Sequence, residues 1–390
     1  MDGFDFLLRP RLLFGPDKID ALGELAAEFG ARRVLVVSDP GIQAVGHDDR
    51  GLTSLRKAGL EAQVWDQVVE NPTTDNVEAG VAVARDYQPD LLVGLGGGSS
   101  MDCAKGINFV YTNGGRMQDY RGYGKATRPM LPMIAVPTTA GTGSETQSYA
   151  LISDAETHVK MACGDPKAAF RVAILDPKLT VTQPPRVTAL TGIDAISHAL
   201  ETFVSKRRNE LSRMFSREAW RLLSANYLRV LSEPTDLEAR AAMQLGACVA
   251  GLAIENSMLG AAHALANPLT QHYDIPHGQA IALVLPHVVR FNDTVTDEGY
   301  MVGEDYHELW RMTDAWVTLE SADITSAEAL ADHVAQTISQ AGLETRLSAC
   351  GIPRDKLGQL AADAAKQWTG TFNPRPVGER ELLDLYEAAY

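Results

Sequence analysis

The first half of the chain alternates short apolar runs, rich in β-branched residues, with helical stretches. This alternation constrains the fold more than any other feature, because parallel strands are buried on both faces and are joined by crossover helices. We expect strands at positions 33–38, 62–65, 90–95, 133–136 and 171–175, with a helix over 49–58. The sequence therefore predicts a parallel sheet covered by helices.

The character of the sequence changes after Gln183-Pro184-Pro185. From Arg186 onward Ala, Leu, Glu and Met dominate, apolar residues recur at helical spacing, and strand-like runs nearly vanish. The length of 390 residues also exceeds the roughly 250–300 residues at which a single core stops growing. We predict two domains, an α/β domain over 1–184 and an all-helical domain over 185–390.

A glycine turn, Gly96-Gly97-Gly98-Ser99-Ser100, follows the apolar run that ends at Leu95 and precedes a helical stretch. Strand, turn and helix in this order bring unpaired N–H groups and the positive end of a helix dipole to one point, which suits a pyrophosphate. Ser99 and Asp102 also have the spacing that would cap the helix. The alternative is an ordinary flexible turn. In the context of a parallel sheet, the motif favours a dinucleotide-binding, Rossmann-like α/β domain.

Two further segments could bind parts of a dinucleotide. Asp39 follows the run at 33–38, where its carboxylate could bind the adenosine ribose and repel a 2′-phosphate, which favours NAD over NADP. The sequence Asp-Pro-Gly at 39–41 is also a common turn. The segment 137–145, PTTAGTGSE, follows another strand and offers hydroxyl groups on a glycine-containing backbone, although it could be only a surface loop.

A carboxylate and an imidazole lie one helical turn apart at Asp194 and His198. The segment is expected to be a helix because Ile193, Ile196 and Leu200 recur at three- and four-residue steps. Side chains at i and i+4 share a helix face, so these two can converge on one ion.

Two more candidate ligands, His263 and His277, follow in the helical half, and the small residues before His263 would allow close helix packing. A set of one carboxylate and three imidazoles without a thiolate disfavours structural zinc patterns and leaves Fe(II), Zn(II) or another first-row divalent ion. A lone histidine is more often a core or surface residue, and we keep that interpretation for His158, His272, His287 and His307.

The order of these motifs resembles the iron-containing, or group III, alcohol dehydrogenase family, whose relatives include glycerol dehydrogenase and dehydroquinate synthase. The matching elements are GGGS-x-x-D-x-x-K at 96–105, PTT-x-GTGSE at 137–145, D-x3-H at 194–198, G-x2-H at 260–263 and PHG at 276–278. The resemblance implies a dehydroquinate synthase-like architecture, NAD-dependent alcohol dehydrogenase activity, and a homodimer or larger homo-oligomer.

The resemblance also implies the residues that bind each cofactor. The ion, iron(II) or alternatively zinc(II), would be held by Asp194, His198, His263 and His277. Together with the glycine turn, the resemblance implies that NAD is contacted by Asp39, Asn71, Gly96, Gly97, Gly98, Ser99, Asp102, Thr138, Thr139, Thr142, Lys160 and Leu179.

Two positions depart from the pattern of lactaldehyde and propanediol reductases in this family. Many of those reductases carry a further histidine four residues after the equivalent of His263, and here that residue is Asn267. The stretch Ile254-Glu255-Asn256 replaces an aromatic-containing segment near the substrate. We therefore do not transfer the proton path or the substrate of those reductases to this chain.

The expected reaction is hydride transfer between NAD(H) and a primary or secondary alcohol, or its aldehyde or ketone, with the ion as Lewis acid. One alternative is a lyase like dehydroquinate synthase, which recycles its NAD and would release no net NADH. A maleylacetate reductase-like enzyme is another. A non-catalytic dinucleotide- or metal-binding module is the alternative outside enzymes.

The charge and the cysteines exclude several other classes. A formal net charge of −15 without a basic run disfavours nucleic acid and anionic membranes as partners and leaves a small-molecule substrate. Charges and two prolines interrupt the first 20 residues before any signal-like or membrane-spanning run develops. The four cysteines are far apart, which indicates reduced thiols and a cytoplasmic location.

Overall fold

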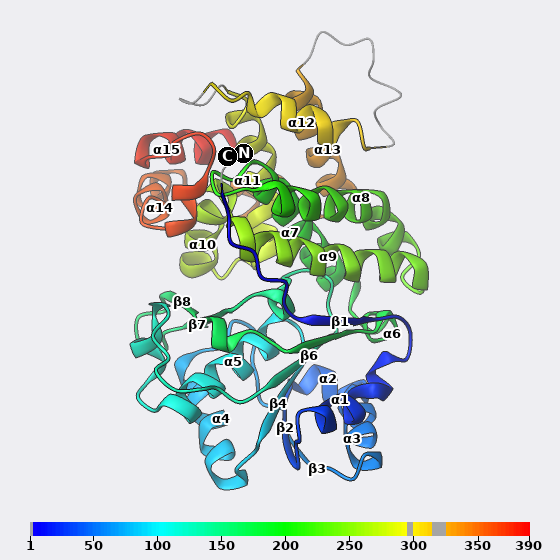
Figure 1. Cartoon of the computed structure of the whole chain (residues 1–390). Helices are drawn as coiled ribbons and strands as arrows, with labels where there is room; N and C mark the ends of the chain where they lie inside the picture. Colours follow the sequence, from blue (N-terminus) through cyan, green and yellow to red (C-terminus); the bar gives the residue numbers. More distant parts are fainter. Residues whose placement is uncertain (1–2, 295–298, 314–324) are drawn as a thin grey trace. The chain divides into compact units, whose positions relative to one another are not determined.

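The computed structural model describes residues 3–294, 299–313 and 325–390 (Figure 1). The chain divides into two compact units. The sheet unit comprises Leu7–Gln183, and the helical unit comprises Met1–Phe6 together with Pro184–Tyr390. The boundaries 1–184 and 185–390, with the cofactor roles assigned to each domain, remain predictions.

The sheet unit is built on six parallel strands in the order β1-β9-β6-β4-β2-β3. The predicted parallel sheet is confirmed, and each of the five expected runs forms a strand within one or two residues of its predicted bounds. The strand β1 was not predicted. The strands are β1 Arg11–Phe14, β2 Arg33–Val37, β3 Glu61–Trp65, β4 Leu91–Gly96, β6 Met133–Pro137 and β9 Val172–Leu175.

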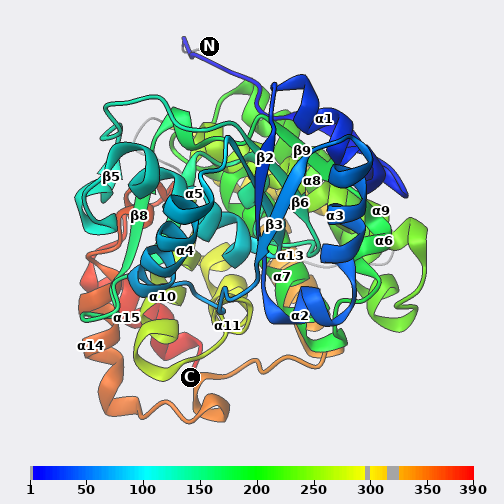
Figure 2. The same ribbon diagram turned by 90° about the horizontal axis from the view of Figure 1, so that it is seen from below.

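Helices cover both faces of this sheet, as the view in Figure 2 shows. The strand β2 illustrates why, because Val34 and Val36 join one apolar cluster and Leu35 and Val37 join the other. The helices α1 and α3 pack in the first cluster, and α4 and α5 pack in the second. The helices of this unit are α1 Leu22–Glu28, α2 Pro40–Ala44, α3 His47–Lys57, α4 Thr74–Tyr87, α5 Gly98–Asn113 and α6 Pro177–Thr180.

A second, smaller sheet has the order β5-β8-β7. It consists of β5 Gly122–Tyr123, β7 Tyr149–Ser153 and β8 Lys160–Gly164, with β7 and β8 antiparallel. Short 3₁₀ helices complete the unit: η1 Lys18–Ala21, η2 Met117–Tyr120, η3 Ser144–Thr146 and η4 Pro166–Ala168.

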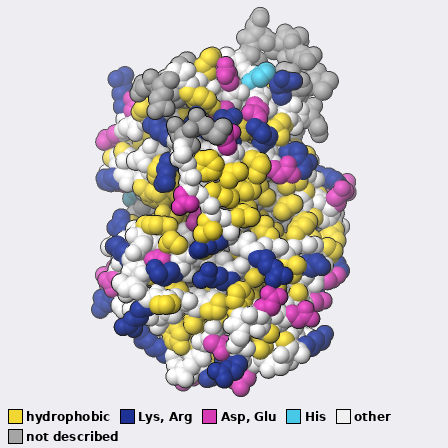
Figure 3. Space-filling view, viewed as in Figure 1, with side chains coloured by type: hydrophobic (Ala, Val, Ile, Leu, Met, Phe, Trp, Pro, Cys, Tyr) yellow, Lys and Arg dark blue, Asp and Glu magenta, His cyan; other side chains and the backbone are white. Residues whose placement is uncertain are grey.

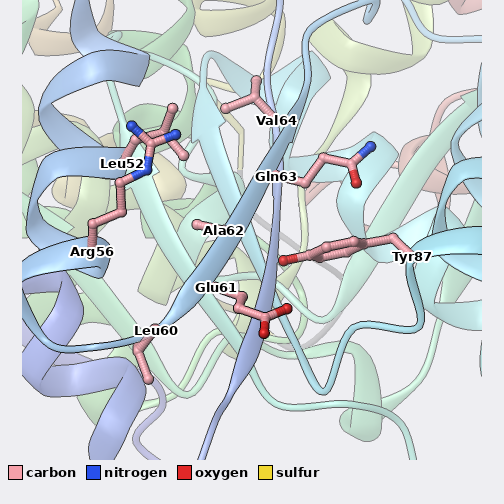
Figure 4. Close-up of a pocket in the computed structure, with 8 residues that line it drawn as sticks. All are labelled: Leu52, Arg56, Leu60, Glu61, Ala62, Gln63, Val64 and Tyr87. Atoms are coloured by element: carbon pink, nitrogen blue, oxygen red, sulfur yellow. The ribbon is translucent and has the colours of Figure 1, made fainter.

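An open hollow lies along the edge strand β3, between side chains of α3 and the last residue of α4 (Figure 4). It shares no residue with the predicted cofactor sites. Its lining residues are Leu52, Arg56, Leu60, Glu61, Ala62, Gln63, Val64 and Tyr87.

The helical unit contains no extended strand among its described residues, as the sequence predicted. Its helices begin where the sequence supplies starts: Pro185 occupies the first turn of α7, and Asn209 and Asp236 cap α8 and α9 with their side chains. The helices are α7 Pro185–Val204, α8 Glu210–Ser232, α9 Leu237–Ser257, α10 Ala261–Tyr273, α11 His277–Phe291, α12 Val302–Trp310, α13 Ser326–Gln340, α14 Leu357–Ala364 and α15 Glu379–Ala388, with 3₁₀ turns η6 Leu347–Cys350, η7 Arg354–Lys356 and η8 Trp368–Phe372.

One helix, α9, is long and apolar enough to cross a membrane, with a mean hydropathy of 1.3. Of its most apolar window, 67% is buried inside the structure. A core helix has the same composition, because it is surrounded by apolar neighbours. Its apolar character is therefore accounted for by packing against α7 and α8.

Candidate metal centre and dinucleotide site

Three helices of the helical unit bring the predicted metal ligands together. Asp194 and His198 lie one turn apart on α7, His263 lies in the first turn of α10, and His277 is the first residue of α11. The helices α10 and α11 pack against each other, and α11 packs against α7. Gly278 allows the last contact, since a Cβ at this position would lie 2.0 Å from the Leu190 carbonyl oxygen.

The four side chains gather around Asp194, and the ligand atoms of Asp194, His263 and His277 all lie within 4.8 Å of one another. Asp194 Oδ1 lies 3.4 Å from His198 Nε2, 3.6 Å from His263 Nε2 and 3.5 Å from His277 Nε2. The Nε2 atoms of His198 and His263 are 3.2 Å apart. Three of the residues are buried and His277 is half-buried. Four residues up to 83 positions apart therefore share one small volume.

These separations fit one divalent ion. Ligand atoms placed about 2.0–2.2 Å from a tetrahedral ion lie roughly 3.3–3.6 Å from one another. Asp194 Oδ1 is buried and accepts no hydrogen bond, although a buried carboxylate oxygen normally has a partner. A cation among the four atoms would satisfy that oxygen.

The electrostatics of the cluster favour the ionised carboxylate. Burial raises the pKa of Asp194, but the neighbouring His198 and His277 imidazoles lower it more, so the pKa lies well below its ordinary value. For His263, burial lowers the pKa, whereas Glu201 and Asp194 raise it, with a net rise to about 9. Asp194 is thus negatively charged at neutral pH and ready to bind a cation.

Glu201 was missed in the sequence although it lies on the same face of α7, one turn after His198. Its Oε2 is 2.5 Å from His263 Nδ1, and its Oε1 accepts a hydrogen bond from the Ala262 N–H at 2.7 Å. The side chain is buried. A charged residue on the apolar side of a helix, at D-x3-H-x2-E spacing, was the available signal.

Two of the histidines that the sequence set aside, His272 and His307, have side-chain partners away from the metal ligands. His272 Nε2 contacts Asp363 Oδ2 at 3.0 Å, and His307 Nδ1 contacts Ser326 Oγ at 2.7 Å. At the position of the missing family histidine, Asn267 donates a hydrogen bond to Gln367 Oε1 at 3.1 Å. An uncharged amide pair therefore stands where those relatives carry an imidazole.

In the sheet unit, the predicted dinucleotide motifs meet at the carboxyl ends of adjacent strands. Gly96 ends β4 and pairs with Pro137 at the end of β6, and Thr138 N–H donates to the Gly96 carbonyl at 2.9 Å. A Cβ at Gly98 would lie 2.7 Å from the Thr142 side chain. The hydroxyl of Thr138 is buried and has no hydrogen-bond partner. The glycine turn and the threonine segment thus form one surface.

The expected cap of α5 was wrong. The helix begins at Gly98, and its N-cap is Gly97, which supplies no side-chain hydrogen bond. Asp102 instead accepts hydrogen bonds from Ser144 Oγ at 2.5 Å and the Leu151 N–H at 3.2 Å. The first N–H groups of α5 are therefore not capped by a side chain.

The fully buried Lys105 holds the loop after β6 in place. Its Nζ donates to Ser144 Oγ at 2.7 Å and to the carbonyl oxygens of Ser144 and Tyr149 at 2.9 and 2.7 Å, and it contacts Asp102 Oδ1 at 3.3 Å. A buried ammonium group requires such partners. The GGGS-x-x-D-x-x-K motif thus fixes α5 to the threonine segment.

Asp39 lies next to the glycine turn and serves also as the turn residue that the sequence allowed. Its Oδ1 accepts hydrogen bonds from the N–H groups of Gly41 and Ile42 at the start of α2, and its Oδ2 accepts one from Ser100 Oγ at 3.1 Å. The strands β2 and β4 are neighbours whose following helices pack on opposite faces of the sheet. Dinucleotides bind at such a switch point in open parallel sheets.

The remaining predicted contacts lie in different places. Asn71 has a left-handed backbone with φ of 52°, and the next residue, Pro72, accepts a hydrogen bond from the N–H of Ser153, which pairs with Lys160. Asn71 and Lys160 are thus both close to Ser153. Leu179 is fully buried in an apolar cluster of the sheet unit that also contains Leu95.

Comparison with known proteins identifies both halves of the chain. Residues 10–177 match the model of the iron-containing alcohol dehydrogenases, and residues 188–390 match the C-terminal model of the Fe-containing alcohol dehydrogenase family. The 1,3-propanediol dehydrogenase of Citrobacter freundii is 34% identical over 99% of both chains. The NAD-dependent methanol dehydrogenase of Bacillus methanolicus is 30% identical over 99% of both chains.

Solved structures of alcohol dehydrogenases have the same fold as this chain. A crystal structure of a 1,3-propanediol oxidoreductase covers 100% of both chains with a TM-score of 0.94 and 33% identity. An alcohol dehydrogenase from Oenococcus oeni gives a TM-score of 0.93 at 30% identity, again with 100% coverage of both chains.

By class, the chain is an oxidoreductase that acts on alcohols. It belongs to the iron-containing alcohol dehydrogenase family, which confirms the predicted resemblance, fold class and activity. The alternatives of a lyase, a maleylacetate reductase-like enzyme and a non-catalytic module have no support among these relatives.

Proposed function

We propose that the chain transfers hydride between NAD(H) and a small alcohol, aldehyde or ketone, using one divalent ion held by Asp194, His198, His263 and His277. The observation that carries this proposal is the convergence of Asp194 Oδ1 with three imidazole nitrogens at 3.4–3.6 Å. Iron(II) is the first candidate for the ion because of the family, and zinc(II) suits the same donor set. The methanol dehydrogenase relative uses NAD by name, which supports NAD here.

A bound divalent ion supplies Lewis-acid chemistry that lowers the pKa of an alcohol, and NAD supplies the hydride acceptor. The residues of the chain bind and orient these groups. Three neutral imidazoles and the Asp194 carboxylate contribute a single negative charge, which leaves a divalent site net positive for a developing negative oxygen. Asn267 holds no ionisable proton, so proton transfer does not pass through its side chain.

The dinucleotide is assigned to the switch point of the sheet unit. The uncapped N-terminus of α5 and the glycine turn would bind the pyrophosphate, Asp39 the adenosine ribose, and the threonine hydroxyls further polar groups. The buried Thr138 hydroxyl without a partner supports a ligand at this place. The assignments of Asn71, Ser99, Asp102, Lys160 and Leu179 are proposals that follow from the family motif alone.

The substrate is proposed to be a short primary alcohol or diol. The relatives include 1,3-propanediol dehydrogenases of Citrobacter freundii and Klebsiella pneumoniae and the methanol dehydrogenase. The amide pair of Asn267 and Gln367 can donate and accept hydrogen bonds, which suits a second hydroxyl group.

The test begins with metal-stripped protein, which is reconstituted with Fe(II) or Zn(II) and assayed for NADH formation with short alcohols and diols. His263→Ala should lose both the ion and turnover, by about 10³-fold or more, because a Lewis acid supplies several kcal/mol. NADH binding, followed by its fluorescence, should persist. Full turnover by metal-free protein would contradict the proposal, and catalysis without net NADH release would favour the lyase alternative.

We further propose a homodimer or larger homo-oligomer in a reducing, cytoplasmic location. The strand β1 pairs only with β9, so among the described residues its outer edge has no partner strand. Phe4, Leu7, Leu8 and Phe14 are exposed, and Figure 3 shows apolar side chains exposed among the charged ones. All four cysteines are free thiols, which supports the reducing location.

A further inference from the structure

The strongest unassigned feature is the carboxylate of Glu201, which contacts two neighbouring residues of α10 at once. Its Oε1 accepts from the Ala262 N–H at 2.7 Å, and its Oε2 lies 2.5 Å from His263 Nδ1. Glu201 and the side chains that it contacts are buried. Such a contact between a buried charge and one ring nitrogen determines which hydrogen bonds that imidazole can make.

We infer that Glu201 is a positioning residue that fixes the tautomer and orientation of His263, so that Nε2 presents a lone pair to the divalent ion. This inference rests on the proposed metal site. An ionised carboxylate can only accept hydrogen bonds, so His263 Nδ1 must carry the proton that is donated to it. The lone pair of the neutral ring is then at Nε2, the atom 3.6 Å from Asp194 Oδ1.

The second contact of Glu201 places the helix that carries His263. The Ala262 N–H belongs to the first turn of α10, whose N–H groups have no partner within the helix. The neighbouring Ala261 N–H donates to Asn373 Oδ1 at 3.2 Å, so two side chains from distant parts of the chain hold this helix start. Because Glu201 holds Ala262 and His263 together, ring orientation and backbone position are set by one group.

The space around the carboxylate leaves little freedom for another arrangement. A Cβ on Gly260 would lie 3.0 Å from Glu201 Oε1 and 2.9 Å from Asn373 Oδ1. Glu201 also shares its helix face with Asp194 and His198, since the three residues follow at four- and three-residue steps on α7. The same face of α7 thus supplies two candidate ligands and the group that orients a third.

The variant Glu201→Gln isolates this role because it keeps the shape of the side chain. If the amide oxygen accepts from the Ala262 N–H, the amide NH₂ faces His263 Nδ1 and favours the tautomer with a proton on Nε2. If the amide is flipped, its NH₂ group faces the Ala262 N–H at the start of α10, so two hydrogen-bond donors oppose each other. Neither arrangement reproduces both contacts of the carboxylate.

The experiment measures the Zn(II) affinity of the stripped full-length protein by competition with a chromophoric chelator. Loss of an outer-sphere partner of a metal-bound histidine typically weakens binding by about 10–100-fold, and we expect this for Glu201→Gln. The matched control is Asp363→Asn, which removes a carboxylate 3.0 Å from His272 Nε2 on the same helix α10. It should bind Zn(II) like the wild type. Thermal unfolding without metal should be similar for all three proteins.

A wild-type protein that binds neither Zn(II) nor Fe(II) would overturn the proposed metal site and this inference with it. Binding by the wild type with equal affinity in Glu201→Gln would overturn the inference alone. If Glu201→Gln does not fold, the inference can still be tested on the wild-type protein alone. In the Zn(II)-loaded wild type, ¹⁵N NMR should show a slowly exchanging proton on His263 Nδ1, and an unprotonated Nδ1 would overturn the inference.

Discussion

Asp48 is a buried carboxyl group of the sheet unit with little to stabilise its charge. Its Oδ1 accepts a hydrogen bond from Ser38 Oγ at 2.7 Å, and its Oδ2 is buried without a hydrogen bond. Burial raises the pKa of Asp48 to about 6, the Ser38 hydrogen bond lowers it, and the nearby carboxylates of Asp39, Asp66 and Asp49 raise it further. Compared with the unfolded chain, the folded state therefore favours the protonated form of Asp48.

We predict that Asp48→Asn stabilises the protein at pH 7–8 but not at pH 4. A pKa of about 6 in the folded state, against 3.8 in the unfolded state, means that the contribution of Asp48 is full below pH 3.8 and is lost as the pH rises through 6. The loss is at most about 3 kcal/mol, at 1.36 kcal/mol per pKa unit. The measurement is the urea midpoint at both pH values, with the exposed Asp49→Asn as control. An equal gain at both pH values would contradict the prediction.

At the scale of residues, sequence spacing predicted the candidate ligands that lie on one helix. It missed the contacts between side chains of two different elements. Asp194 and His198 follow from a four-residue step on one helix. Glu201 did not, because its partner His263 is 62 positions away and no local pattern joins them. The cap expected from Ser99 failed for a related reason, since Asp102 is engaged by Ser144, 42 positions away.

At the scale of elements, the proposed metal centre depends on how closely α11 approaches α7. A Cβ at Gly278 would meet the backbone of Leu190 at 2.0 Å, so a larger residue must move one helix. His277 is the neighbouring residue and would move with α11. The glycine is therefore part of the geometry of the site although it offers no ligand.

We predict that Gly278→Ala lowers the free energy of unfolding by about 1–3 kcal/mol, as overpacking of tight contacts does. It should also weaken Zn(II) binding through the displacement of His277. The measurements are urea unfolding and chelator competition. The control is Gly358→Ala in α14, where a Cβ meets nothing within 4 Å and helix propensity favours Ala by about 1 kcal/mol. Unchanged Zn(II) affinity in Gly278→Ala would refute this dependence.

The central strands of the large sheet and its edge strand β3 were predictable, whereas β1 and the strands of the small sheet were not. The strands β2, β4, β6 and β9 are buried apolar runs, which the sequence shows directly. The strands β1 and β7 are short and only partly buried, and β5 has two residues, so none of them is a fully buried apolar run. The order of the six strands depends on tertiary packing, which no local sequence pattern encodes.

At the scale of the whole molecule, the exposed apolar N-terminal segment bears on assembly. Leu7 and Leu8 are each 59% exposed and lie just before β1, whose outer edge has no partner strand in the described part of the chain. Exposed strand edges pair readily with other chains unless they are protected. We propose that a second copy of the chain packs against this edge and the exposed leucines.

We predict that the wild type has a solution mass of at least twice 42.2 kDa, and that Leu8→Asp shifts it toward 42.2 kDa by burying a charge in the contact. Light scattering after size-exclusion chromatography measures both. Phe29→Asp, an exposed apolar position outside this segment, is the control and should leave the mass unchanged. A wild-type mass of 42.2 kDa would exclude the oligomer.

Asp39, the proposed ribose ligand, also accepts hydrogen bonds within the protein, which limits how this enzyme could change its coenzyme preference. Removing the carboxylate to admit a 2′-phosphate would also remove the acceptor for Gly41, Ile42 and Ser100. Only replacements that still start a helix well, such as Asn, Ser or Gly, keep α2 in place while discarding the negative charge. Few substitutions at Asp39 can therefore begin a change of preference from NAD to NADP, whether in evolution or by engineering. An alanine substitution would change the coenzyme specificity and unfold the start of α2 at the same time.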